Sequence, residues 1–468
     1  MNEKKDYISR AKHERIVQEL EGIIIALQKE NKELKERIAQ LEKNSSNSSK
    51  PPSSDIVKPK KDRKKRKRRK KRTSQGGHRK LLPAEEIDKV ENLILETELC
   101  PECSSKLNKD MKKGKIQQVA ELVEKPVEII EYRLEGYWCP RCRKYHYPKL
   151  PNGIIEGSFC QVRLRALLIY LKGTLGMSYT GIVDYCRDVL KLKLSRAMIG
   201  DILKGSLKPL RPIYDELKEY MRTLQVLYID ESGWKDNANR YWLWVFCTEL
   251  VSLFTIATSR SSKVLEEVLG EFFDGIIVSD FFSAYFKYAA EKNQFCLAHL
   301  IRDIKYLQTL PSEEEKEFGD RLLRYFKRLF KIWHDRENLE PDKFAAKMQR
   351  LKNELFNYLN KVNFDKSKSR TLKNRLLKNW ESLFLFVDRP DDVEPTNNLS
   401  ERTLRFLVLI RKMTQGTRSA WGREWVAILA SIKSTLNKQN RNTWEFLVEA
   451  LSAYYSNSKL PSLLPELA

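Results

Sequence analysis

The chain has 468 residues, long enough for about three domains. Its 87 Lys and Arg residues outnumber its 63 Asp and Glu residues, and the resulting net charge of +24 favours a polyanionic partner, either nucleic acid or an anionic membrane. Because no apolar run approaches about 18 residues and the first residues lack the apolar core of a signal peptide, we expect an intracellular protein without membrane spans or disulfides.

Near the N-terminus, leucines recur every seven residues at one core position of a heptad repeat: Leu20, Leu27, Leu34 and Leu41. The other core position holds Val17, Ile24, Asn31 and Ile38. This leucine-zipper pattern predicts a coiled coil over residues 14–43, and its single polar core residue favours a parallel dimer in fixed register. A lone amphipathic helix or a bundle helix is the alternative.

Residues 44–80 form a polar linker that we expect to be disordered, with a strongly basic run inside it. The run, Lys58–Arg72, has thirteen basic residues and one acid, and so carries half of the net charge. We expect it to bind phosphates without sequence preference, although a solvated tail or a nuclear address would have the same composition. The centre of the run holds the candidate DNA contacts Lys64, Lys65, Arg66, Arg68 and Arg69.

Two C-x-x-C pairs lie 35 residues apart: Cys100 with Cys103, and Cys139 with Cys142. In an intracellular chain this spacing predicts a tetrahedral Cys₄ zinc site, with a redox pair as the alternative. The residues between the pairs read as strands, so we expect a structural zinc ribbon over residues 81–158. The remaining cysteines lie in apolar contexts typical of core residues: Cys160, Cys186, Cys247 and Cys296.

Residues 159–222 read as helices. Ser178 and Ser195 are the expected N-caps of two short helices joined by a short turn. The pair is either a DNA-binding helix-turn-helix or an ordinary helical hairpin.

The centre of the chain, residues 223–302, predicts the element order β-β-β-α-β-α-β-α, beginning with an antiparallel meander. The first strand is expected to end at Asp230 and the fourth at Asp280. The helix before the fourth strand is expected over residues 262–273, and the last strand over residues 294–298. If these strands are neighbours, the two carboxylates meet. Residues 303–390 are highly charged with helical periodicity, which indicates a helical insertion.

A third carboxylate, Glu401, opens a helix in the closing segment, residues 391–456. Its spacing from Asn398 is that of a capping box, so one interpretation of Glu401 is purely structural. The other interpretation is a cluster with Asp230 and Asp280, which would need cations. Two Mg²⁺ ions are the natural choice, because Mg²⁺ prefers oxygen ligands and pairs of ions assist in-line displacement at phosphates.

Each acid of this cluster has an alternative. Asp280 could cap the helix expected from Phe282. Glu231 and Glu394 are rival third ligands.

At these residues the chain resembles the transposases of the insertion-sequence-66 family, of the DDE type. Ordered segments carry the resemblance over roughly residues 15–455: NSSKPPSSD after the zipper, SQGGHRK, the paired CPxC knuckles, YIDESGW, VSDFFSAY, CLAHLIRD and EPTNNLSERTLRFLVLIRKMTQGTRSAWG. Two departures are Ser104 and Arg143, which stand where the family's knuckles often have glycine.

The resemblance implies a multidomain α+β protein with a ribonuclease H-like mixed sheet, in which Asp230, Asp280 and Glu401 bind the catalytic metal. It also implies zinc ligation by the four knuckle cysteines. Positioning, DNA-contacting or supporting roles follow for Asn397, Asn398, Arg402, Arg405, His299 and Arg302, and we add Arg411 and Lys412 from the basic stretch after Glu401.

The function implied is a DNA transposase that cleaves phosphodiesters at element ends and transfers strands into target DNA. Its partners would be the terminal repeats, the target DNA, a second copy through the zipper and accessory proteins, in the cytoplasm and nucleoid of a bacterial host. A same-fold nuclease or junction resolvase, and a non-enzymatic DNA-binding regulator, are the alternatives.

Overall fold

The computed structural model describes residues 10–42, 81–90, 105, 116, 118–120, 126–141, 143–365 and 367–465. The chain divides into two compact units, one of Met1–Pro59 with Tyr132–Ala468 and the other of Lys60–Glu131. Among the helices of these described ranges, none is both long and apolar enough to cross a membrane. The basic run and most of the linker around it lie outside the described residues.

The heptad segment is a single helix, α1 (Arg10–Leu41), so its predicted helical structure is confirmed. Leu20, Leu27 and Leu34 of the heptad core are 52–58% exposed within the single chain. The apolar stripe of α1 is therefore exposed in the single chain, and a second copy would bury it in a coiled coil. The dimer itself stays a prediction.

In the second unit, described residues 81–90 contain a short 3₁₀ helix, η2 (Ala84–Glu86). The side chain of Gln118 makes two hydrogen bonds with the backbone of Leu82, at 2.7 and 3.0 Å. Strands were expected between the two cysteine pairs, but residues 118–120 and 126–136 contain none. That expectation is wrong for these residues, because their alternating apolar pattern meets no partner strand.

Cys139, the first cysteine of the second pair, ends β1 (Tyr137–Cys139), which pairs antiparallel with β2 (Lys144–His146). Arg143, at the position where the family often has glycine, has a φ of 51°. This left-handed conformation is one that glycine adopts at low cost, so the departure from the family pattern leaves a strained residue in the turn.

Four helices follow: α2 (Val162–Gly173), α3 (Tyr179–Asp188), α4 (Arg196–Gly205) and α5 (Leu207–Met221). The predicted caps are confirmed, because Ser178 accepts the amide of Gly181 at 2.9 Å and Ser195 accepts that of Met198 at 3.1 Å. Helices α2, α3 and α4 pack on one another. A DNA-binding role for this cluster stays a prediction.

The centre folds as a five-stranded mixed sheet in the order β5-β4-β3-β6-β7. Its strands are β3 (Val226–Asp236), β4 (Asn239–Cys247), β5 (Ser252–Ala257), β6 (Phe272–Ser279) and β7 (Ala289–Phe295). Strands β3, β4 and β5 pair antiparallel, whereas β6 lies parallel to β3 and β7. With α6 (Lys263–Leu269), α7 (Ser283–Lys287) and α8 (Leu297–Leu307), the predicted order β-β-β-α-β-α-β-α is confirmed.

Element boundaries differ from the prediction at two places. The helix α6 ends at Leu269, and Phe272 and Phe273, which were expected in that helix, begin β6. Gly270 has a φ of 93°, which ends the helix as glycine often does. The strand expected at residues 294–298 lies earlier in the chain as β7.

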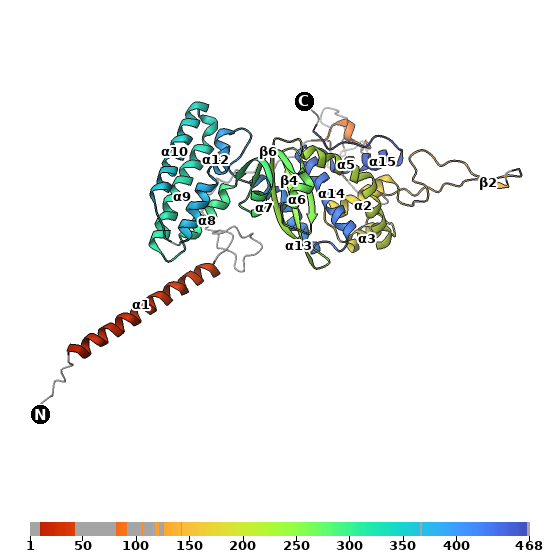
Figure 1. The fold of residues 1–468 in the computed structure, drawn as a ribbon. Helices are drawn as coiled ribbons and strands as arrows, with labels where there is room; N and C mark the ends of the chain where they lie inside the picture. The colour runs from red at the N-terminus through yellow and green to blue at the C-terminus, as the bar shows by residue number, and fades with distance from the viewer. Residues whose placement is uncertain are drawn as a thin grey trace. The chain divides into compact units, whose positions relative to one another are not determined.

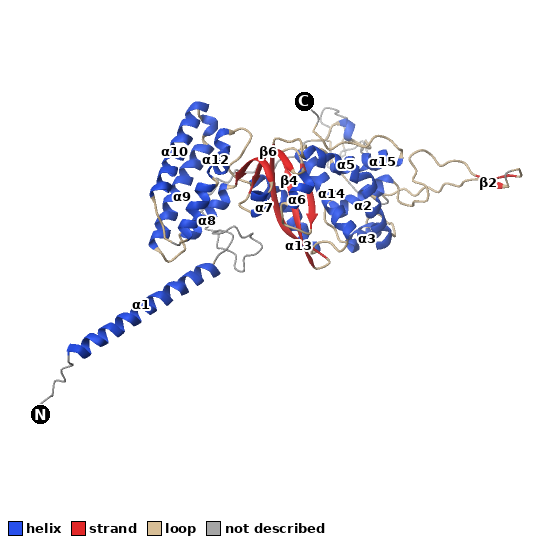
Figure 2. Cartoon of the chain, in the orientation of Figure 1, coloured by secondary structure: helices blue, strands red, loops and turns tan. Residues whose placement is uncertain are grey.

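Helices α9 (Glu313–His334), α10 (Pro341–Lys361), α11 (Lys368–Lys378) and α12 (Trp380–Asp388) fill the predicted helical segment. They pack on one another, and α12 also packs on β7 (Figures 1 and 2). The chain closes with α13 (Asn398–Thr414), α14 (Ala420–Lys438) and α15 (Thr443–Tyr455), of which α13 lies against β3 and β4 and α14 against β5.

Candidate active site

The pairing of β3 with β6 brings Asp230 and Asp280 to equivalent positions. The parallel register joins Tyr228 with Val278, and each aspartate stands two residues further along its own strand direction. The expected neighbour relation of the first and fourth strands is therefore present. Asp280 directly follows β6, but β3 continues to Asp236, so the expectation that the first strand ends at Asp230 is wrong. Antiparallel pairing with β4 extends β3 beyond the β6 ladder.

Successive residues of a strand point to opposite faces of the sheet, and this separates Asp230 from Glu231. Asp230 shares its face with Tyr228 and Ser232, and both of these residues contact the α13 region. The Tyr228 hydroxyl accepts the Glu394 amide, in the loop before α13, at 3.0 Å. Arg411 of α13 donates to the Ser232 hydroxyl at 3.1 Å. Glu231 therefore points away from the α13 face, a geometry that disfavours the alternative in which it is the third ligand on that face.

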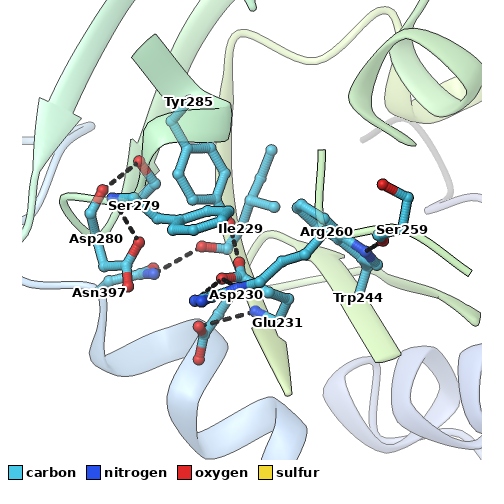
Figure 3. Close-up of polar contacts among 11 residues, drawn as sticks. Ile229, Asp230, Glu231, Trp244, Ser259, Arg260, Ser279, Asp280, Tyr285 and Asn397 are labelled. Atoms are coloured by element: carbon cyan, nitrogen blue, oxygen red, sulfur yellow. Dashed lines mark hydrogen bonds and ion pairs between the residues drawn. The ribbon is translucent and has the colours of Figure 1, made fainter. Parts of the chain in front are cut away.

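Glu231 is the centre of a buried network on the opposite face, which Figure 3 shows. Arg260 donates to its Oε1 from Nε at 2.7 Å and also from Nη2, and the Tyr285 hydroxyl donates to its Oε2 at 2.5 Å. The guanidinium of Arg260 also stacks on Phe282, with Cζ 3.7 Å from the ring centroid, and on Trp242, at 4.8 Å. The network ties β3 to the α7 segment that follows Asp280.

Both aspartates hold their protons more tightly than free carboxyls do. Burial raises the pKa of Asp280 to about 7, with the Glu231 carboxylate adding to the effect and Arg260 opposing it. Burial and the Glu231 and Asp280 carboxylates raise the pKa of Asp230 well above its usual range. One Asp280 oxygen accepts the Phe282 amide at 3.1 Å. The residue before α7 is Phe282 and no side chain caps that helix, so the interpretation of Asp280 as its cap is wrong.

Glu401 lies in the first turn of α13 and does not act as a helix cap. The residue before the helix is Asn397, not Asn398 as the capping-box interpretation required, and no side chain caps the first turn. The similar stretch at α15 does behave as a cap, since Asn442 accepts the amides of Trp444 and Glu445 at 2.9 and 3.3 Å. Asparagine and glutamate have the same spacing in both stretches. In α15 the asparagine caps the helix, whereas in α13 neither Asn398 nor Glu401 does.

The Glu401 carboxylate faces α8 instead. Its Oε1 is 3.8 Å from Arg302 Nη2 and 3.9 Å from His299 Nδ1, both longer than hydrogen bonds. Burial raises the pKa of Glu401, and Arg302 opposes the shift. The Glu401 carboxylate makes a small contribution to the raised pKa of both aspartates, behind burial and Glu231.

His299 is neutral at neutral pH, because burial and the nearby Arg302 lower its pKa to about 4. Its contact with Glu401 is therefore not an ion pair. Arg302 lies 3.1 Å from Nε2 of His299, and because arginine can only donate, the imidazole proton belongs on Nδ1. That Nδ1 is buried and has no hydrogen-bond partner among the described residues. It is a neutral donor held at the site.

Asn397 joins the start of α13 to both aspartate-bearing strands. Its Nδ2 donates to the carbonyl of Ile229, the residue before Asp230, at 2.7 Å. Its backbone amide contacts Cys296 Sγ at 3.2 Å, and the Cys296 amide in turn donates to the carbonyl of Ser279, the residue before Asp280, at 2.8 Å. The side chain of Asn397 is 1% exposed, and its Oδ1 has no partner in the described part of the chain.

These residues fit a hard cation in part. Asp230, Asp280 and the unpartnered Oδ1 of Asn397 offer the oxygen ligands that Mg²⁺ prefers. Within the described ranges, however, no three His, Cys, Asp or Glu side chains lie close enough together to share an ion. The expected convergence of Glu401 with the two aspartates is thus absent from this arrangement, because Glu401 is turned toward α8.

The other predicted residues have separate environments. Asn398, Arg402 and Arg405 are exposed on α13, so Arg405 does not share the buried environment of Asn397. Arg411 is half-buried and bound to β3, and Lys412 is exposed. The basic residues Lys64, Lys65, Arg66, Arg68 and Arg69 lie outside the described part of the chain.

The predicted zinc ligands cannot be placed by side chain. Cys100, Cys103 and Cys142 lie outside the described residues, as does the side chain of Cys139. The remaining cysteines are free and buried, as expected of core residues: Cys160, Cys186, Cys247 and Cys296.

Sequence reasoning missed Arg260 and Tyr285. Tyr285 ends the segment VSDFFSAY and Arg260 lies in none of the quoted segments, but both join Glu231 only through the tertiary fold. A glutamate on an otherwise apolar strand was the available signal, since a buried carboxylate requires partners.

The fold and the site define an α/β protein whose two central parallel strands present a half-buried pair of aspartates. Residues 157–424, more than half of the chain and including all three acids, match the family model described as the Transposase IS66 family. The chain belongs to this family, which confirms the resemblance seen in the sequence. Residues 4–82 match a second model, described as a family of unknown function (DUF6444).

Among curated proteins, the chain is similar to the uncharacterized protein y4jD of Sinorhizobium fredii. The two are 24% identical over 289 residues, which cover 55% of this chain and 56% of that protein. The chain thus spans little more than half the length of this relative.

Proposed function

We propose that this chain is a DNA transposase with a ribonuclease H-like core, which cleaves phosphodiesters at the ends of its element and joins them to target DNA. The observation that carries the proposal is the register that sets Asp230 beside Asp280 within a segment matched to a transposase family. Two neighbouring aspartates with raised pKa values are costly to ionise together without cations, and phosphoryl-transfer sites use divalent ions in this role.

In this proposal Asp230 and Asp280 hold Mg²⁺, with Asn397 Oδ1 as a neutral oxygen nearby. The bound cation would neutralise the carboxylates and offset the negative charge that builds on the reacting phosphate. Asn397 keeps the helix α13 and both strands in fixed relation, so the two aspartates stay aligned. His299 offers its Nδ1–H to a phosphate oxygen, because it is a neutral donor without a partner.

Glu401 is the third carboxylate of the proposal. Its side chain is 34% exposed, and its contacts to α8 are too long to be hydrogen bonds, so it is able to turn toward the aspartates. Glu394 is the remaining rival, and its side chain is exposed ahead of α13.

Other parts of the chain supply DNA and partner binding in this proposal. The run Lys58–Arg72 attaches to phosphates, the Cys₄ zinc ribbon and the helices α3 and α4 contact DNA, and α1 dimerises the protein. Each of these assignments rests on sequence pattern.

The test uses the full chain with Mg²⁺ or Mn²⁺ and a plasmid that carries the DNA flanking its gene on both sides. We expect Asp280→Asn, Asp230→Asn and Glu401→Gln to abolish cleavage while binding of the same DNA persists, and Glu394→Gln to retain activity. Joined products from the wild type identify a transposase, whereas cleavage without joining indicates a nuclease. Unchanged cleavage in Asp280→Asn would refute the proposed site.

A further inference from the structure

A cavity of about 870 Å³ lies where the β3–β4 hairpin meets the C-terminal end of α13. Its charged lining is entirely basic: Lys235, Arg240, Arg411, Lys412 and Arg418. No Asp or Glu lines it. We call this cavity the hairpin groove.

Four of the five cations of the hairpin groove are available to a ligand. Lys235, Arg240, Lys412 and Arg418 are exposed, and none of them makes an ion pair in the described part of the chain. Arg240 stacks on Trp242, with its Cζ 4.7 Å from the ring centroid, which restricts the guanidinium without neutralising it. The one acid next to the groove, Asp236, is buried and paired with Arg423. The groove thus keeps a net charge of about +5.

The walls of the groove are fixed by backbone contacts. Thr417 donates its amide to the Lys235 carbonyl at 3.0 Å and accepts the Asn237 amide at 2.8 Å, and its hydroxyl accepts Trp234 Nε1 at 3.1 Å. Gly416 has a φ of 98°, and a Cβ there would collide with the Lys235 carbonyl. Arg411 reaches from α13 to the Gly233 carbonyl and the Ser232 hydroxyl. Such a preformed site loses little conformational entropy on binding.

The groove follows β3 beyond the aspartate pair and takes cations from both faces of the strand. Arg411 binds Ser232 on the Asp230 face, whereas Lys235 and its cross-strand partner Arg240 alternate onto the Glu231 face. Ser232, which binds Arg411, lies on the same face of β3 as Asp230 and about 7 Å further along, at about 3.4 Å per residue. The tip of the hairpin at Asn237 is about 23 Å beyond Asp230 by the same measure. A nucleic-acid strand advances about 3.4 Å per nucleotide, so this span corresponds to roughly two to seven nucleotides.

We propose that the hairpin groove binds the phosphate backbone of DNA next to the reacting phosphodiester, at phosphates roughly two to seven nucleotides away. The proposal rests on the proposed function and adds a defined DNA-binding site outside the basic run and the zinc ribbon. The occupant is DNA because the groove offers several separated, exposed cations without a counter-charge, which suits a repeating polyanion better than a single small anion.

The test measures the binding of a fluorescent 30-base-pair duplex of arbitrary sequence by the full chain between 50 and 200 mM KCl. We expect Lys412→Gln with Arg418→Gln to reduce the slope of log affinity against log salt by about 2, since each lost phosphate contact changes it by about 0.9. The affinity loss across this salt range then becomes about tenfold smaller than in the wild type.

The matched control removes the same charge from exposed lysines of α10, as Lys343→Gln with Lys347→Gln, and should leave the slope unchanged. Lys412→Arg with Arg418→Lys should also keep the wild-type slope, and thermal denaturation checks that each variant folds. An unchanged slope in the groove variant, or an equal change in the α10 control, would overturn the groove proposal.

The same measurement, set beside the cleavage assay of the wild type, separates this proposal from the proposed function. If the wild type itself does not cleave DNA but the groove substitutions still change the salt slope, the groove proposal stands and only the proposed function fails. If the wild type cleaves DNA but the groove substitutions do not change DNA binding, the proposed function stands and the groove proposal fails.

Discussion

Asp230 and Glu231 are adjacent in the chain and lie in opposite environments. Asp230 is on the α13 face beside Asp280, whereas Glu231 is on the other face, bound by Arg260 and Tyr285. Strand alternation produces this division, so a single acidic dipeptide supplies a candidate ligand on one face and a structural anchor on the other.

At the residue scale, the raised pKa of Asp280 predicts how stability depends on pH. The folded state holds this proton up to about pH 7, whereas the unfolded chain releases it near pH 4. The folded state therefore binds more protons within this window, and the free energy of unfolding falls as pH rises from about 4 to 7. In EDTA, we expect thermal denaturation to show a loss of about 1–3 kcal/mol over this range.

Asp280→Asn should flatten this pH dependence and stabilise the metal-free chain at pH 8. Mg²⁺ should stabilise the wild type more at pH 8 than at pH 5, because the ion competes with protons for the carboxylates. Asp274→Asn, at an exposed aspartate of β6, is the control and should keep the wild-type slope. If the free energy of unfolding of both the wild type and this control rises between pH 4 and 7, the raised pKa of Asp280 is contradicted.

Gly416 gives a second prediction at the residue scale. Gly416→Ala adds a Cβ against the Lys235 carbonyl at a backbone conformation that favours glycine. We expect it to lower the free energy of unfolding by about 2–4 kcal/mol in urea denaturation. Gly200→Ala is the matched control, since Gly200 lies in α4 with nothing within 4 Å, and it should stabilise the chain by about 0.5–1 kcal/mol. Equal effects at both sites would exclude a special role for Gly416.

At the scale of the element, α1 carries an apolar stripe that the single chain leaves exposed. A charge at the heptad core would be buried in a dimer, whereas a charge on the outer face would stay in water. Leu27→Lys should therefore convert a dimer into a monomer in sedimentation velocity. Gln18→Lys, which adds the same charge at an outer heptad position, should remain dimeric. A wild type that sediments as a monomer would refute the zipper.

The edge strand β5 shows how another element depends on a distant helix. The Ser252 and Phe254 amides of β5 donate to Thr435 and Ser431 of α14, at 3.0 and 2.8 Å. The helix thus satisfies backbone groups that an open sheet edge would expose to pairing with another chain. This packing also sets the sheet and the closing helices in fixed relation, and so supports the position of α13.

At the scale of the whole molecule, charge is divided between a long basic run and the folded core. The run Lys58–Arg72 holds about half of the net charge, and the hairpin groove adds a fixed basic site. A run of lysines and arginines binds phosphates through counterion release, which high salt suppresses.

Replacing residues 58–72 with a Gly/Ser segment of equal length should therefore weaken DNA binding and reduce its salt dependence, while cleavage at low salt persists. Fluorescence anisotropy and a cleavage assay with Mn²⁺ measure both effects. Loss of cleavage at every salt concentration would mean that the run takes part in the reaction itself.

Much of this protein was predictable from local sequence signals. The heptad of α1, the order of strands and helices in the core and the caps at Ser178 and Ser195 all depend on neighbours within a few positions, and the structure confirms them. The two aspartates could also be selected, because each lies on or directly after a buried strand.

Tertiary structure decided the rest. Asp230 and Asp280 are 50 positions apart and become neighbours only through the register of β3 with β6. The sequence around Glu401 is equally compatible with a cap, and only the tertiary fold brings Arg302 of α8 to within 3.8 Å of that carboxylate. Arg260 and the hairpin groove have no local signature, because their roles come from long-range contacts that sequence spacing does not encode.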